Sequence, residues 1–368
     1  MPTQSESRMD DALFTLLNLD GTLIDKRLEP AISPDDLKRL YELMVLTRVL
    51  DDRLLRMQRQ GRIGFYITSL GEEAAHIGSA FALGDEDWVF PQYRESSAAF
   101  LRGYPLYEYI CQMFGNSGDI LKGRQLPSHY AYRKAHYLST SSPVATQIPQ
   151  AVGFAWGAKI KKEKLVTLVY FGDGATSHQD FHMGLNFAGV FKVPVVFFCK
   201  NNQWAISVPF NRQTASQTVA VKATAYGLEG IRVDGNDMLA VISATRKAVE
   251  KAKNGGGAAL IEAVTYRMGP HSTSDDPRIY ADESKLKEWG EKDPIVRFRK
   301  YLATKGLWTE SYEHELMKKV QDEITDTIKR AEKNPPPPLV SMFEEVYAEM
   351  PQYLKEEYEE AAKFYHGE

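Results

Sequence analysis

Two short polar motifs, each following an apolar segment, contain the residues of this chain whose types and spacing are best suited to chemistry. The first is Gly-Asp-Gly at 172–174, and the second is the Asn pair at 201–202. Asp173 and Asn202 are 29 positions apart, which is enough for one strand–helix–strand crossover. Neighbouring parallel strands end at the same edge of a sheet, so we expect both side chains to meet there. Their oxygens suit Mg²⁺, and the glycines and the start of the next helix suit a diphosphate.

The spacing of these motifs resembles the thiamine-diphosphate motif, in which Gly-Asp-Gly is followed by an Asn pair about thirty residues later. A purely structural turn is the alternative. From about residue 33 onward the chain also resembles the alpha subunits of branched-chain 2-oxo acid dehydrogenases, over about four-fifths of its length. The matching stretches are GEEAAHIGSA (71–80), QYRE (92–95), GRQLPSHY (123–130), SSPVATQIPQAVG (141–153), VDGND (233–237) and YRMGPHSTSDDP (266–277).

The resemblance implies oxidative decarboxylation of a branched-chain 2-oxo acid with thiamine diphosphate and Mg²⁺. The acyl group would pass to a lipoyl group on an acyltransferase component. A beta subunit would contribute the Glu that activates the cofactor, so an α₂β₂ heterotetramer is expected. Two alternatives stay open: the alpha subunit of pyruvate or acetoin dehydrogenase, and a non-catalytic regulatory or scaffold protein on the same fold.

Matching the family's functional residues to positions in this sequence implies a set of residues that bind the cofactor and its metal. Asp173, Asn202 and the main-chain carbonyl of Trp204 match Mg²⁺ ligands; the family commonly has Tyr at position 204. Lys200 falls where mammalian relatives have a phosphate-binding Arg, and it keeps the charge without the forked geometry. The other implied diphosphate contacts are Tyr93, Arg94, His271 and the backbone at Gly174 and Ala175.

The same resemblance assigns roles around the substrate. Ser142 matches a residue near the reacting centre and the cofactor, Gln92 a neighbour of the substrate, and Phe65 and Tyr66 are candidate apolar wall residues. His271 is the candidate acid–base group, because a histidine changes charge near neutral pH.

Two further sites are implied. Ser272 lies where relatives carry a regulatory phosphate, in a segment (268–280) that we expect to be a mobile loop. A site for a monovalent cation, usually K⁺, is expected at Ser141, Pro143, Thr146 and Gln147.

Alternating apolar and helical segments from about residue 140 predict an α/β fold, a doubly wound and mostly parallel sheet with flanking helices. We expect residues 1–32 to form an extended arm with a hairpin and residues 33–330 to form the thiamine-diphosphate-binding domain. Ser33 should cap the first helix, with proline directly after it. Residues 331–368 should form a Pro-rich spacer and a helical tail.

Composition narrows the function classes. The net charge of −4 and the pI of about 6.1 do not favour a nucleic-acid partner. No apolar run approaches the ~18 residues of a membrane helix, so no membrane association is expected. Two cysteines are too few for a disulfide framework or a thiolate zinc site. The polar, acidic start lacks the pattern of a signal or transit peptide, and we expect a cytoplasmic protein.

Three other patterns favour structural roles. An Asp-Gly-Thr sequence like that of haloacid-dehalogenase phosphatases has Asn18 where the nucleophilic Asp would stand, and an amide cannot form the phosphoenzyme. Glu73 and His76 have metal-site spacing but no second copy of the motif, which favours a polar pair on a helix. His178 and His182 are expected at the surface.

Overall fold

The computed structural model describes residues 13–365, and its centre is one parallel sheet. The strand order is β1-β2-β3-β7-β6, and every neighbouring pair runs parallel. This confirms the predicted doubly wound α/β fold. A separate antiparallel pair is formed by β4 and β5. The strands are β1 (Trp88–Phe90), β2 (Thr167–Gly172), β3 (Val195–Asn201), β4 (Trp204–Ala205), β5 (Val208–Pro209), β6 (Glu229–Asp234) and β7 (Ala259–Val264).

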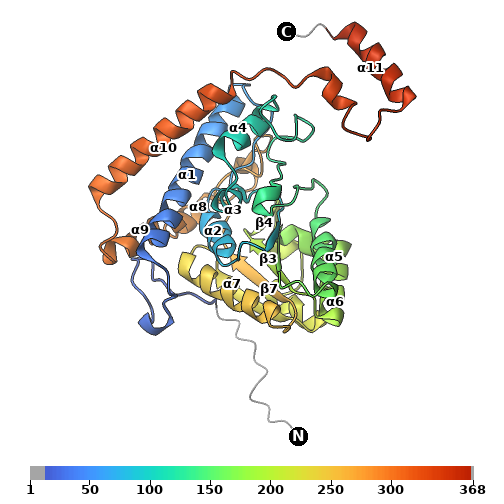
Figure 1. The fold of residues 1–368 in the computed structure, drawn as a ribbon. Coiled ribbons are helices and arrows are strands. Elements are labelled where there is room, and N and C mark those ends of the chain that lie inside the picture. Colours follow the sequence, from blue (N-terminus) through green and yellow to red (C-terminus); the bar gives the residue numbers. More distant parts are fainter. Residues whose placement is uncertain (1–12, 366–368) are drawn as a thin grey trace.

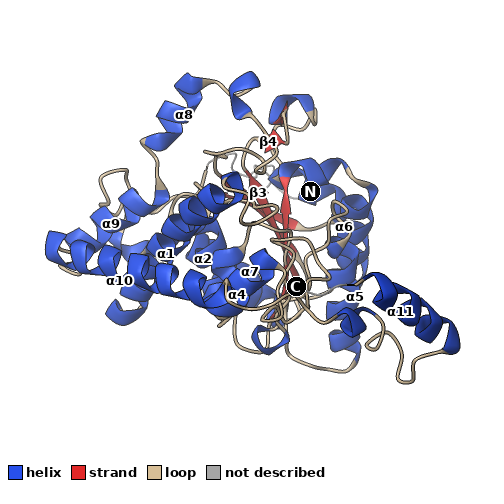
Figure 2. Ribbon diagram, turned by 90° about the horizontal axis from the view of Figure 1, so that it is seen from above, coloured by secondary structure: helices blue, strands red, loops and turns tan. Residues whose placement is uncertain are grey.

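Helices cover both faces of this sheet (Figures 1 and 2). The central strands are apolar at nearly every position, which is typical of strands buried on both sides. The helices are α1 (Pro34–Arg59), α2 (Glu73–Phe81), α3 (Ser96–Leu101), α4 (Leu106–Phe114), α5 (Gln147–Ile160), α6 (Gln179–Phe191), α7 (Met238–Lys253), α8 (Glu283–Gly290), α9 (Pro294–Thr304), α10 (Glu310–Ala331) and α11 (Gln352–Phe364).

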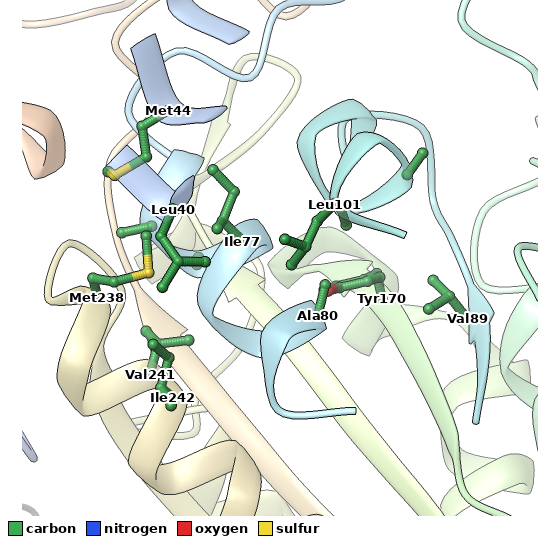
Figure 3. Close-up of a cluster of buried hydrophobic side chains, with 14 of the residues drawn as sticks. Leu40, Met44, Ile77, Ala80, Val89, Leu101, Tyr170, Met238, Val241 and Ile242 are labelled. Atoms are coloured by element: carbon green, nitrogen blue, oxygen red, sulfur yellow. The ribbon is translucent and has the colours of Figure 1, made fainter. Parts of the chain in front are cut away.

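Alternate residues of each strand enter two different cores. In β2, Tyr170 packs with α1, α2 and α7, whereas Phe171 packs with α5 and α6. Figure 3 shows the first core, where Leu40 of α1 lies between Met238 of α7 and Ile77 of α2. The two-residue period of a strand therefore fixes which side chains face each helical layer.

The described part of the predicted N-terminal arm packs onto the domain. The expected turn forms, because the amide of Asn18 donates to Thr22 and the amide of Gly21 to Asn18. Just before it, Leu16 is buried and its amide donates to Asp237. Residues 1–12 lie outside the described part. Ser33 caps α1 as predicted, accepting a hydrogen bond from the Asp36 amide.

The C-terminal segment leaves the body of the domain. Helix α10 runs alongside α1, and α11 stands apart from both (Figure 1). The tail helix occupies 352–364, within the predicted spacer and tail at 331–368, and none of its residues is buried. Among the residues described, no helix has the length and apolar character needed to cross a membrane.

Candidate active site

A cavity of about 380 Å³ opens at the carboxyl ends of β2 and β3. Open α/β sheets bind ligands at this edge. The cavity brings together most of the side chains that the sequence assigned to cofactor and substrate, from segments far apart in the chain. These are Gln92, Tyr93, Arg94, Ser142, Asp173, Gly174, Ala175, Lys200, Asn202, Trp204 and His271.

Asp173 offers the cavity one unpaired carboxylate oxygen. It follows directly after β2 and is only 1% exposed. Its Oδ2 accepts a hydrogen bond from Nε2 of Gln213 at 2.7 Å, whereas Oδ1 is buried without a hydrogen-bond partner in the described part of the chain. Burial raises the pKa of Asp173 to about 6. A buried carboxylate in this condition is stabilised by a cation.

The amide of Asn202 has a defined orientation. Its Nδ2 donates to Oε1 of Glu72 at 2.7 Å, and a carboxylate can only accept. The oxygen Oδ1 therefore points away from Glu72, and it accepts a long hydrogen bond of 3.2 Å from the amide of Trp204. The Gly-Asp-Gly motif packs tightly against β4, since a Cβ on Gly174 would lie 2.7 Å from Cβ of Ala205. Gly174 is thus required for this close approach.

Buried charges support the floor of the cavity. Lys200 is paired with Glu95, and its Nζ lies 3.7 Å from Oε2 of Glu72. Burial alone would raise the pKa of Glu72, but Lys200, His76 and Arg94 together hold it below its ordinary value. Glu72 and Glu95 are therefore the two acidic side chains that hold Lys200 in place. Neither residue has an expected role from the sequence motifs.

Arg94 and His271 form one unit. The guanidinium of Arg94 donates to the carbonyls of Thr68 and His271, both at 2.6 Å, and its Nη2 lies 3.2 Å from Nδ1 of His271. Because Arg can only donate, Nδ1 accepts and the ring hydrogen sits on Nε2. Burial, Arg94 and Arg267 lower the pKa of His271 to about 4. The ring is thus neutral at pH 7, which differs from the expected change of charge near neutral pH.

Ser142 contacts His129, a histidine with no expected role from the sequence motifs. Its Oγ lies 2.7 Å from Nε2 of His129. The segment GRQLPSHY at 123–130 carried the family resemblance, but His129 within it was given no role. No spacing rule links the two residues, because the contact depends on how two loops fold together.

Arg267 was also missed. Its Nη2 donates to the carbonyl of Ile206 at 2.7 Å and to the hydroxyl of Tyr280 at 2.6 Å. Its Nη1 is buried and has no hydrogen-bond partner among residues 13–365. A signal was present, since Arg267 lies four residues before His271 in the quoted stretch YRMGPHSTSDDP.

The predicted monovalent-cation residues lie beside the cavity rather than in its lining. Ser141, Pro143 and Thr146 are in the turn before α5, and Gln147 is the first residue of that helix. Nε2 of Gln147 donates to the carbonyl of Tyr170 at 2.8 Å. Its Oε1 is buried without a hydrogen-bond partner in the described chain, so an oxygen ligand is available there.

Phe65 and Tyr66 do not line the cavity, so the structure corrects their assignment as wall residues. The physical reason for Tyr66 is its hydroxyl, which donates to buried Asp51 at 2.6 Å and holds the ring in the core. Ser272 is 9% exposed and its Oγ accepts a hydrogen bond from the amide of Ser274. Segment 268–280 includes a short 3₁₀ helix, Pro277–Ile279.

The expected pair between Glu73 and His76 is not formed. Glu73 binds Nε of Arg48 at 2.5 Å, and Nε2 of His76 instead lies 3.3 Å from Glu72. His178 caps α6 and His182 contacts the hydroxyl of Tyr226, in agreement with structural roles. Within residues 13–365, no group of three or more His, Cys, Asp or Glu side chains could hold a metal. A magnesium site built from one carboxylate, one amide and phosphate oxygens needs no such group.

A doubly wound parallel sheet with Gly-Asp-Gly and Asn motifs at its carboxyl edge defines a thiamine-diphosphate-binding enzyme chain. Residues 41–340 match the model of the dehydrogenase E1 component family, and the chain belongs to that family.

Its relatives include alpha subunits of mitochondrial 2-oxoisovalerate dehydrogenase. The Homo sapiens protein is 42% identical over 352 residues, covering 95% of this chain and 79% of the relative. The Caenorhabditis elegans protein is 42% identical over 350 residues (95% and 81%). The alpha 1 protein of Arabidopsis thaliana is 43% identical over 358 residues (97% and 75%).

Proposed function

We propose that this chain is the alpha subunit of the decarboxylating component of a branched-chain 2-oxo acid dehydrogenase. One observation carries the proposal. The motif residues Asp173 and Asn202 share a cavity with the arginine, lysine and histidine that the family resemblance assigned to a diphosphate. The names of the relatives, all of which refer to 2-oxoisovalerate, support the branched-chain substrate.

The residues of the cavity fit thiamine diphosphate with Mg²⁺. Asp173 has a buried oxygen without a partner, and the amide of Asn202 is turned so that Glu72 holds its nitrogen. These two side chains, with the carbonyl of Trp204, would hold the metal. Arg94 and Lys200 would offset the diphosphate charge. When bound, thiamine diphosphate supplies the carbon nucleophile and the electron sink for decarboxylation.

The chain's own residues then bind and orient. Close packing at Gly174 keeps the backbone near the diphosphate, because a larger residue would meet Ala205. His271 keeps its hydrogen on Nε2 while Arg94 holds Nδ1, so the neutral ring can donate one hydrogen bond in a fixed direction. Burial and the neighbouring guanidinium of Arg94 disfavour protonation of the His271 ring unless a negative charge lies close to it.

The proposal includes partners. A beta subunit would complete the active site in an α₂β₂ tetramer, and a lipoyl-bearing acyltransferase component would receive the acyl group. The unpaired Oε1 of Gln147 supports a K⁺ site next to the cavity, with Ser141, Pro143 and Thr146 as the other ligands. A cytoplasmic location stays a prediction from sequence, whereas the relatives are named as mitochondrial; cell fractionation tests it.

The decisive experiment is reconstitution with the beta subunit, thiamine diphosphate and Mg²⁺, followed by assays on several 2-oxo acids. We expect activity only in the presence of both chains. Branched acids should lead in kcat/KM without excluding pyruvate, since a methylene in an apolar pocket is worth only ~10–200-fold. A tenfold lead for pyruvate would place the chain with the pyruvate dehydrogenases. Absence of turnover with every acid would favour the non-catalytic alternative.

A further inference from the structure

The hydroxyl of Ser142 is bound to a buried histidine that has no role in the function proposed above. Ser142 lines the cavity, and its Oγ lies 2.7 Å from Nε2 of His129. His129 is 5% exposed and comes from a loop 13 positions earlier in the chain. The pair therefore connects the cavity to an imidazole in the protein interior.

The second ring nitrogen of His129 determines the direction of this hydrogen bond. Nδ1 lies 3.2 Å from the carbonyl oxygen of Pro127, which can only accept. Nδ1 therefore carries the hydrogen, and in a neutral imidazole Nε2 has a lone pair and accepts from Ser142. The assignment follows from the hydrogen-bond network. The hydrogen of Ser142 is thus directed to His129, and its oxygen lone pairs remain for a donor in the cavity.

The loop that carries His129 is held by a buried glutamine of α4. Nε2 of Gln112 donates to the carbonyl of Leu126 at 2.8 Å, and its Oε1 accepts from the amide of Ser128 at 3.0 Å. Ser128 has φ 68°, a left-handed conformation that is unfavourable for a serine. Such conformations persist where the surrounding structure determines them, often at functional sites. The imidazole is therefore presented to Ser142 by a fixed loop.

We propose that His129 is a positioning residue that acts through Ser142 and makes this hydroxyl a hydrogen-bond acceptor and proton relay in the cavity. In the relay, a donor group of the bound reactants gives its proton to Oγ of Ser142 while the hydroxyl proton moves to Nε2 of His129. The hydroxyl is unchanged, the imidazole becomes imidazolium, and the donor loses one proton. The inference rests on the proposed function, which assigns the cavity to decarboxylation.

The two imidazoles near the cavity have different surroundings. His271 lies beside the guanidinium of Arg94, whereas His129 makes no ion pair within the described residues. Its ring contacts are the carbonyl of Pro127 and the hydroxyl of Ser142. Proton transfer to His129 therefore does not place a second positive charge directly against an arginine. The geometry therefore distinguishes a histidine held next to a cationic side chain from one that is hydrogen-bonded to neutral groups.

The test uses the complete enzyme with its beta subunit, cofactor and Mg²⁺. We expect Ser142→Ala and His129→Gln each to lower kcat about 100-fold with little change in KM, the lower end of the range for proton-transfer groups. The double variant should be no slower than Ser142→Ala, because residues acting as one unit are not additive. Both variants should also lose the same limb of the kcat–pH profile. His136→Gln is the matched control, since Nδ1 of His136 also lies near a main-chain carbonyl, that of Asp85, but its ring is outside the cavity lining.

A measurement without turnover completes the test. Deuterium exchange at the C2 position of each histidine, followed by mass spectrometry across pH, gives a titration midpoint for His129 and for His136. Ser142→Ala should shift the first midpoint and leave the second unchanged. Thiamine diphosphate affinity by calorimetry should stay within about threefold in His129→Gln, since His129 holds neither metal nor diphosphate. If His129→Gln fails to fold, Ser142→Ala and the exchange data decide.

Three results would overturn the proposal: wild-type kcat in His129→Gln, additive losses in the double variant, or an unshifted His129 midpoint. A wild-type enzyme that decarboxylates no 2-oxo acid would instead overturn the proposed function. In that case the exchange measurement would still report whether Ser142 and His129 are coupled.

Discussion

The cavity has a sheet wall, at Asp173 and Asn202, and an opposite wall, at Glu72, Arg94 and His271. The contacts that form these two walls join residues at different separations along the chain. On the sheet side, Asp173 and Asn202 end two neighbouring strands of a single crossover. On the opposite side, the Asn202–Glu72 contact joins residues 130 positions apart, and the Arg94–His271 contact joins residues 177 positions apart. The first wall follows from a local motif, and the second depends on the complete fold.

The walls also differ in how well their charges are satisfied. Asp173 keeps a buried oxygen with neither a hydrogen-bond nor an ion-pair partner in the described chain, whereas Glu72 and Glu95 both lie within ion-pair distance of Lys200. A buried charge without a partner is costly, so a bound cation would stabilise the ionised form of Asp173. On the opposite side, Glu72 and Glu95 are held by ion pairs to Lys200 of β3. We therefore propose that the sheet side binds the metal and that the opposite side orients its ligands.

The largest effect should come from the sheet wall. Asp173→Ala or Asn202→Ala removes a hard oxygen ligand without changing the apolar strands behind it. We expect calorimetry with thiamine diphosphate and Mg²⁺ to show affinity weakened beyond the ~10–100-fold typical of residues that only support a metal ligand. Circular dichroism should show the wild-type fold. Wild-type affinity in either variant would disprove the magnesium assignment.

A charge at Ser272 tests the opposite wall. Ser272→Glu would bring a carboxylate to a side chain that is only 9% exposed, next to His271 and close to Asp275, which binds the His271 amide. An unpaired buried charge costs several kcal/mol, and a phosphate there would act in the same direction. We expect kcat/KM to fall at least about 100-fold.

The uncharged variant Ser272→Gln is the control for size. It should retain most of the activity if charge is the cause. Equal losses in both variants would show that the position rejects any larger side chain, and the regulatory interpretation of Ser272 would then lose its physical basis.

Variants of the adjacent residues Glu72 and Glu73 should distinguish the orientation of Asn202 from the stability of the fold. Glu72 holds Nδ2 of Asn202, whereas Glu73 turns away and pairs with Arg48 of α1. Glu72→Gln should weaken Mg²⁺ affinity about 10–100-fold, as expected for a residue that supports a metal ligand. Glu73→Gln should lower the melting temperature by breaking a buried ion pair and leave the metal affinity unchanged. The reverse result would place the support of Asn202 elsewhere.

These contrasts explain how much could be predicted from sequence. The parallel sheet, the cap at Ser33 and the meeting of Asp173 with Asn202 follow from apolar periodicity and local spacing, and the structure confirms them. The support by Glu72 was missed because a buried carboxylate has no periodic signal, and its partners lie on distant segments.

Two expectations from the sequence, for Tyr66 and His271, are wrong for the same physical reason. Tyr66 is expected from the sequence to be an apolar wall residue, but its hydroxyl donates a hydrogen bond to Asp51 in the core. His271 is expected from its type to titrate near neutral pH, but burial, and after it Arg94, lower its pKa. In both cases the surroundings of a side chain, rather than its type, decided its role. Such surroundings are fixed only when all segments have folded.

The smallest expected effect concerns the unpaired oxygen of Asp173. Since the folded state raises the pKa of Asp173 from 3.8 to about 6, the stability that the protonated side chain contributes is lost as pH rises through this range. Above pH 6 the buried charge destabilises the cofactor-free chain by up to about 3 kcal/mol. Asp173→Asn carries no charge and can keep its hydrogen bond to Gln213, so its free energy of unfolding should exceed that of wild type at pH 8. Below pH 4 the two proteins should be equal in stability.

Adding thiamine diphosphate and Mg²⁺ at pH 8 should reverse this order. Ligand binding to the folded state stabilises wild type in proportion to RT ln(1 + [L]/Kd), by ~2.7 kcal/mol at a hundredfold excess over Kd. The variant should gain much less, because it lacks the charged ligand. Urea unfolding at pH 4 and pH 8, with and without cofactor, measures all four values. If Asp173→Asn is less stable than wild type without cofactor at pH 8, then Asp173 already has a stabilising partner within the chain, and the sheet wall needs no external cation.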